Sequence, residues 1–64
     1  MTFELPGTNR AFEINEDGQV FLAGTNRLVF FKEGNQWHIV MPIPLEREDW
    51  EEILEYNYAR VSGR

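Results

Sequence analysis

The chain offers few side chains that could carry out chemistry, and the most reactive of them stand alone. His38 is the single histidine of the 64 residues, cysteine is absent, and Ser62, the only serine, lies near the C-terminus. Acid–base and nucleophilic catalysis need an imidazole or carboxylate placed beside a nucleophile, and no such pairing can be recognised. Because a lone histidine beside aromatic residues is more often packed than catalytic, we expect a protein that is not an enzyme.

Metal and cofactor sites are equally poorly supported. A chain with one histidine and no cysteine supplies neither a thiolate site nor a histidine-rich site. It also has no glycine-rich phosphate loop and no metal-ligand spacing, so we expect no cofactor and no metal. Arg10 and Arg27 occupy the same place in two copies of the motif GTNR and could bind a phosphate or a carboxylate. The simpler expectation is that both are solvated loop residues.

Charge restricts the possible partners further. The formal net charge of −5 makes nucleic-acid backbones and anionic membranes poor partners. No apolar stretch approaches the roughly 18 residues of a membrane span. The segment MTFELPG lacks the basic start and the apolar run of a signal peptide. We therefore expect a cytosolic protein that neither binds nucleic acid directly nor enters a membrane.

The two copies of GTNR, which lie 17 positions apart, indicate how the chain folds. Six positions are identical when residues 7–23 are aligned with residues 24–40. Apolar residues alternate with polar ones in both copies, which is the period of a strand with one buried face. Each copy therefore predicts a β-hairpin, and the GTNR segments are predicted as four-residue loops that join one hairpin to the next.

Turn residues set the predicted register of these hairpins. Glu16–Gly18 and Glu33–Asn35 are predicted as three-residue loops, with Gly18 and Asn35 in the left-handed conformation. The expected strands then cover residues 2–5, 11–15, 19–23, 28–32 and 36–41. In this register one face of the sheet, called the inner face below, carries the apolar residues Phe3, Leu5, Phe12, Ile14, Val20, Leu22, Val29, Phe31, Trp37, Ile39 and Met41.

A helix is predicted over about residues 47–60. Trp50, Ile53, Leu54 and Tyr58 recur there at helical spacing and form one apolar stripe, and Glu46 is the expected N-cap, although glutamate is a poor one. The fold class that follows is α+β: a five-stranded antiparallel meander with one C-terminal helix packed on the inner face. Residues 1–64 form one small domain.

The opposite, outer face of the predicted sheet is apolar where a solvated face should be polar. Its predicted contiguous patch contains Phe21, Leu28, Phe30, His38 and Val40. Such patches mark interaction surfaces, unless the sheet curls and covers the patch within the fold. Aromatic side chains on a sheet also resemble platforms on which RNA bases stack. Lys32 is the only base predicted on this face, however, and the acidic net charge argues against RNA.

Two functions remain from these observations. The leading hypothesis is a small non-enzymatic protein-interaction or assembly module that binds a protein partner, or a second copy of itself as a homodimer, through the patch. The alternative is an acidic inhibitor whose helix occupies the basic groove of a nucleic-acid-binding protein. Its carboxylates, which could equally be the solvated side of an amphipathic helix, are Glu48, Glu51, Glu52 and Glu55.

Overall fold

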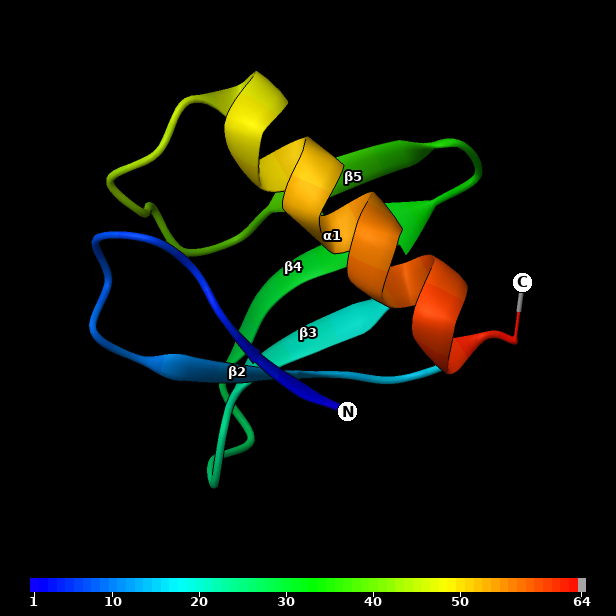
Figure 1. Ribbon diagram of the computed structural model, residues 1–64, viewed down its shortest axis with the longest axis horizontal. Coiled ribbons are helices and arrows are strands. Elements are labelled where there is room, and N and C mark those ends of the chain that lie inside the picture. The colour runs from blue at the N-terminus through cyan, green and yellow to red at the C-terminus, as the bar shows by residue number, and fades with distance from the viewer. Residues whose placement is uncertain (64) are drawn as a thin grey trace.

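The computed structural model describes residues 1–63, which form a five-stranded antiparallel sheet and one helix (Figure 1). The strands pair in the order β1-β2-β3-β4-β5, so each strand lies beside its neighbour in sequence. The predicted α+β meander with a C-terminal helix is therefore confirmed. The elements are β1 (Thr2–Glu4), β2 (Ala11–Ile14), β3 (Gln19–Leu22), β4 (Leu28–Glu33), β5 (Gln36–Ile39) and α1 (Arg47–Val61).

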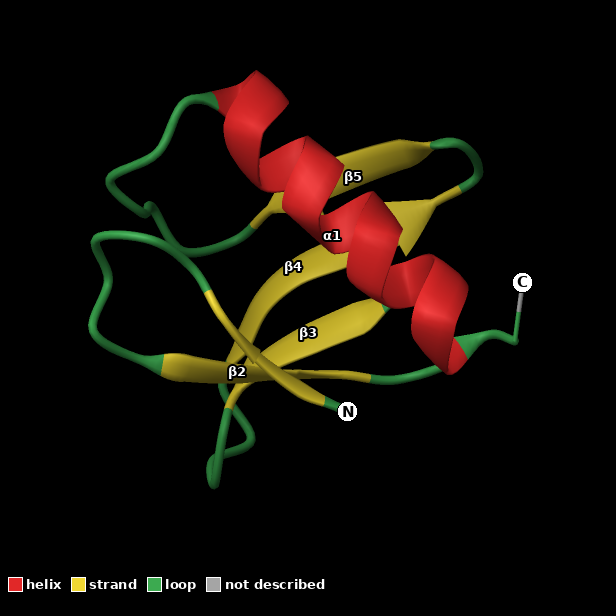
Figure 2. Ribbon diagram, in the orientation of Figure 1, coloured by secondary structure: helices red, strands yellow, loops and turns green. Residues whose placement is uncertain are grey.

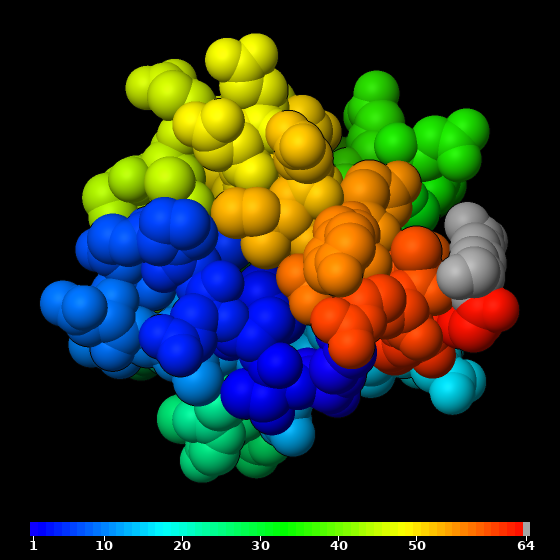
Figure 3. Space-filling model, viewed as in Figure 1, coloured from blue at the N-terminus to red at the C-terminus, as the bar shows by residue number. Residues whose placement is uncertain are grey.

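The helix α1 lies diagonally across the inner face of the sheet (Figure 2). It begins after Glu46, whose side chain makes no capping hydrogen bond, so the helix start depends on packing rather than on a cap. Trp50 and Leu54 are buried against the sheet, and the ring of Trp50 contacts that of Phe30 at 4.8 Å between centroids. Seen from this side, the N-terminal segment, the loop before α1 and the helix close over the core (Figure 3).

Both GTNR loops adopt the same conformation, which explains the repeat. In each loop the threonine donates from its backbone N–H and from its hydroxyl to a carbonyl three residues earlier, at 3.3 and 2.8 Å for Thr8 and at 3.0 and 2.8 Å for Thr25. The same hydroxyl accepts the backbone N–H of the following arginine. The preceding glycines have φ of +80° and +77°, where a side chain would be strained.

The loops are six residues long rather than the four predicted, because pairing stops earlier. Glu4 pairs with Ala11 and Phe21 pairs with Leu28, so the shared unit is Leu-x-Gly-Thr-Asn-Arg. As a result Phe3 lies opposite Phe12 instead of Ile14. A shift of two residues keeps every side chain on its predicted face, and the inner face of β1 and β2 is therefore as expected.

The two hairpin turns, in contrast, differ from one another. The turn between β2 and β3 has three residues, with Gly18 at φ +80° and a hydrogen bond of 3.1 Å from the N–H of Asn15 to the carbonyl of Gln19, as predicted. The turn between β4 and β5 has two, because Glu33 pairs directly with Gln36. There Gly34 has the positive φ, of +62°, and the prediction of a left-handed Asn35 is wrong.

This shorter turn changes which side chains of β4 face the helix. Val20 pairs with Phe30 but Phe21 pairs with Leu28, so Val29 is an extra residue that forms a β-bulge. Val29 and Phe30 are consequently both fully buried. Beyond the bulge, Phe30 and Lys32 point to the inner face and Phe31 to the outer face. The predicted placement of these three residues is wrong, because the sequence pattern contains no mark of the bulge.

Candidate functional site

The outer face of the sheet carries no helix, because α1 is the only helix of residues 1–63 and it lies on the inner face. Paired residues share a face, so the register identifies the side chains that point outward. The outward strand residues are Thr2, Glu4, Ala11, Glu13, Gln19, Phe21, Leu28, Phe31, Glu33, Gln36 and His38. No lysine or arginine occurs among them.

Four of these side chains form a continuous apolar area, named here the outer-face patch: Phe21, Leu28, Phe31 and His38. Phe21 lies opposite Leu28, and Phe31 lies opposite His38. The rings of Phe31 and His38 stack, with centroids 4.9 Å apart and planes inclined by 20°. Each of the four is only partly buried. The patch is therefore a flat, solvent-facing area of cross-strand pairs rather than an internal second core.

Phe30, predicted as a member of the patch, does not belong to it. Its side chain is 0% exposed and contacts the ring of Trp50 on the inner face. Phe31 takes its place beside His38, because the bulge at Val29 exchanges the two faces of β4. Phe21, Leu28 and His38 lie on the outer face as predicted. Val40 is 52% exposed and follows the end of β5, where its N–H donates to the carbonyl of Val29.

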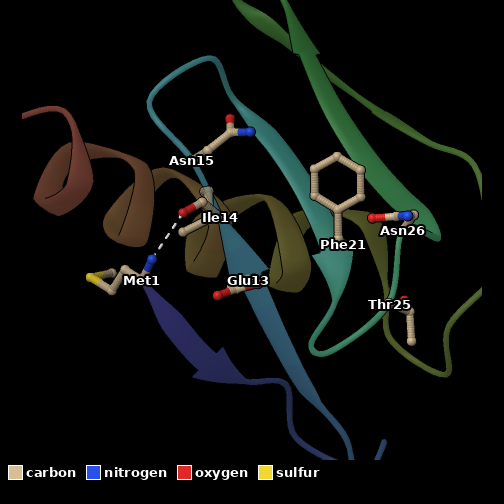
Figure 4. A pocket seen from close by; sticks show the side chains of 7 residues that line it. All are labelled: Met1, Glu13, Ile14, Asn15, Phe21, Thr25 and Asn26. Atoms are coloured by element: carbon tan, nitrogen blue, oxygen red, sulfur yellow. Dashed lines mark hydrogen bonds between the residues drawn. The ribbon is translucent and has the colours of Figure 1, made fainter.

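A hollow of about 310 Å³ adjoins the outer-face patch at Phe21 (Figure 4). Most of its polar groups already have partners within the chain. The side-chain oxygen of Asn15 accepts the N–H groups of Asp17 and Gln19, and the Thr25 hydroxyl bonds within its own loop. The hollow is therefore an extension of the surface rather than a ready-made ligand cradle. Its lining residues are Met1, Glu13, Ile14, Asn15, Phe21, Thr25 and Asn26.

Lys32, which was expected to point outward, instead lies between the sheet and the helix. Its side chain is 12% exposed, and its Nζ is 2.9 Å from a carboxylate oxygen of Glu55. The same ammonium lies 5.2 Å from the ring centroid of Trp37 and 5.3 Å from that of Tyr58. The inward turn of Lys32 leaves the centre of the outer face without a cation.

The acidic stripe of the helix is partly neutralised by the chain itself. Glu51 accepts a hydrogen bond of 3.3 Å from Arg47, one turn earlier, and Glu55 binds Lys32. Glu48 and Glu52 are exposed and form no ion pair with a described residue. Two of the four predicted carboxylates are thus engaged in holding α1 in place.

The exposed arginines lie at one end of the sheet and the turn carboxylates at the other. Arg10 and Arg27 end the two GTNR loops, whereas Glu33 and the residues of the β2–β3 turn lie at the opposite ends of the same strands. Neither arginine forms an ion pair within residues 1–63. The outer side of the sheet therefore has a positive end and a negative end.

Metal binding and membrane insertion find no support in the part of the chain that the structure describes. No group of three or more histidine, cysteine, aspartate or glutamate side chains is arranged to hold a metal ion in residues 1–63. Within the same range, no helix has the length and apolar character needed to cross a membrane.

Comparison with known proteins gives the chain no relative. No model of a known protein family matches it, and no curated protein or solved structure does so either.

Proposed function

We propose that this protein is a non-enzymatic protein-interaction module and that it binds through the outer-face patch. The observation that supports the proposal is the bare outer face: Phe21, Leu28 and Phe31 are partly exposed side by side on a sheet whose helix covers only the other face. Exposed aromatic residues gathered in one area are typical of binding surfaces. A cytosolic location remains part of this proposal.

The charge of the outer face favours protein over nucleic acid. Its outward strand residues include the carboxylates Glu4, Glu13 and Glu33 and no lysine or arginine. A base-stacking platform needs cations that follow the phosphate backbone, and here the lysine that could have served, Lys32, lies against the helix. Direct binding of RNA or DNA is therefore not proposed.

Site-specific photo-cross-linking tests the proposal, because it captures a partner whose identity is unknown. p-Benzoylphenylalanine is introduced at Phe31, and in a matched variant at Tyr56, which is 64% exposed on the helix side. After irradiation of the native host, we expect position 31 to yield a discrete cross-linked protein and position 56 to yield none. Products of equal yield from both positions, or no product from position 31, would contradict the proposal.

The acidic-inhibitor alternative gives the reverse result in the same experiment. A cross-linker at Glu48 or Glu52 would then capture a basic protein, whereas one at Phe31 would not. Charge reversal of these two glutamates to lysine would abolish that capture and leave the helix intact, because neither forms an ion pair with a described residue.

A further inference from the structure

We propose that the occupant of the outer-face patch is a second copy of this chain, docked with its β4 antiparallel to the first. The inference rests on the proposed function and names its partner. It is carried by the order of side chains along the outer side of one strand: Arg27, Leu28, Phe31 and Glu33. This order reads positive, apolar, aromatic, negative, and it is complementary to its own reversal.

A two-fold axis passing between Leu28 and Phe31 makes this complementarity explicit. A two-fold interface brings the same surface of both copies together, so that residue i contacts residue j and j contacts i. With the strands antiparallel, Leu28 meets Phe31 of the partner subunit at the centre. Arg27 then meets Glu33 of the partner subunit at both ends.

The charges flanking β4 select the antiparallel arrangement over the parallel one. Arg10 and Arg27 lie at one end of the sheet, and the exposed carboxylates Glu16, Asp17 and Glu33 lie at the other. Parallel docking would place like charges together, which disfavours association. Antiparallel docking pairs opposite charges. Because Arg27 is exposed and the Glu33 side chain is 77% exposed, both can reach across without being extracted from the fold.

The inward orientation of Lys32 completes the argument. In the predicted register this lysine would have stood beside the aromatic residues of the outer face, opposite the same lysine of a second copy. In the structure it binds Glu55 on the inner face, so the centre of the interface contains only Phe21, Leu28, Phe31 and the stacked His38. An apolar centre with charges at its rim is the usual anatomy of a protein interface.

Size also supports a second copy. The Cα atoms extend over 27 by 25 Å in the two longer directions, and the sheet lies across them. A face of these dimensions is comparable to the roughly 800 Å² per partner of a standard interface. A chain of this length is marginally stable by itself, and covering the outer face would supply apolar burial that one helix cannot.

Sedimentation equilibrium on the full chain tests the inference through a charge exchange. The wild type is expected to have twice the chain mass, and Phe31→Glu to be a monomer with an unchanged far-UV circular dichroism spectrum. Arg27→Glu and Glu33→Arg should each weaken dimerisation by about tenfold, because each places like charges together at both ends of the interface. The double variant R27E/E33R should restore the wild-type dissociation constant, since the pairs are merely exchanged.

A helix-side variant provides the control. Glu48→Arg changes the net charge by the same amount as Glu33→Arg but lies on the helix, and it should leave the dimer unaffected. A wild-type monomer at concentrations up to about 1 mM would overturn the inference, as would a dimer that the double variant fails to restore. If position 31 nevertheless cross-links to a different host protein, the proposed function stands and only its partner assignment fails.

Discussion

The two copies of the sequence repeat begin alike and end differently, and the difference decides the surface of the protein. Their GTNR loops share hydrogen bonds, dihedral angles and pairing positions. Their hairpin turns have three residues in the first copy and two in the second. Loss of one turn residue reverses the side chains that follow. A bulge at Val29 absorbs the reversal, and one of two adjacent phenylalanines becomes core while the other becomes surface.

The largest expected effect separates these two phenylalanines. Phe30→Ala should lower the free energy of unfolding by about 3–5 kcal/mol, because it empties a fully buried site beside Trp50. Phe31→Ala should cost about 1 kcal/mol or less, since the side chain is partly exposed. Urea denaturation measures both at a concentration where the protein is in one oligomeric state. Equal losses would show that the bulge does not exchange the faces of β4.

If Phe30→Ala proves too unstable to measure, Phe30→Leu and Phe31→Leu keep the comparison accessible. The buried position should again show the larger loss, because leucine fills the ring cavity incompletely.

The next effect compares the glycines of the two hairpin turns. Gly18→Ala should destabilise by about 2–3 kcal/mol and Gly34→Ala by about 1 kcal/mol, because both have positive φ but only Gly18 is also crowded. A Cβ at Gly18 would lie 2.8 Å from the Cβ of Lys32, whereas one at Gly34 meets nothing within 4 Å. Thermal unfolding of the two variants measures the difference. A larger loss at Gly34 would contradict the assigned turn geometry.

A smaller effect tests whether the GTNR loops are equivalent. Thr8→Val and Thr25→Val each remove a hydroxyl that donates at 2.8 Å and accepts an arginine N–H. Each should cost about 1 kcal/mol, and the two losses should agree within error. Valine keeps the shape of threonine, so the change reports the hydrogen bonds. Strongly unequal losses in chemical denaturation would mean that the loops only resemble each other in outline.

The smallest effect concerns the inward-pointing end of β4. A double-mutant cycle between Lys32→Met and Glu55→Gln should give a coupling energy of about 0.5–1 kcal/mol, because the Glu55 side chain is half exposed and its attraction is screened. The surface pair Arg47 and Glu51 serves as the reference and should couple by about 0.3–0.5 kcal/mol. A coupling of zero for Lys32 and Glu55 would remove the ion pair as an anchor of α1.

Most of the fold followed from local patterns, whereas the candidate site followed only in part. Alternation of apolar residues located all five strands, and helical spacing placed α1 within one residue of its observed end. Phe21, Leu28 and His38 lie on the outer face as predicted, since each precedes or follows the irregular part of β4. Phe30 was assigned to the wrong face, because EGNQ supports a three-residue and a two-residue turn equally well by composition. Asn57, buried on the helix, was not anticipated at all.

What the sequence determined by itself was the set of elements, their order and the two repeated loops, because these depend on residue periods and on glycine and threonine at given positions. Only the tertiary structure decided which face of β4 became core. That choice depends on filling the space under Trp50 with Phe30 and on bringing Lys32 within reach of Glu55. Both contacts join residues distant in sequence, and packing energy of this kind outweighs the local alternation that would have kept the strand regular.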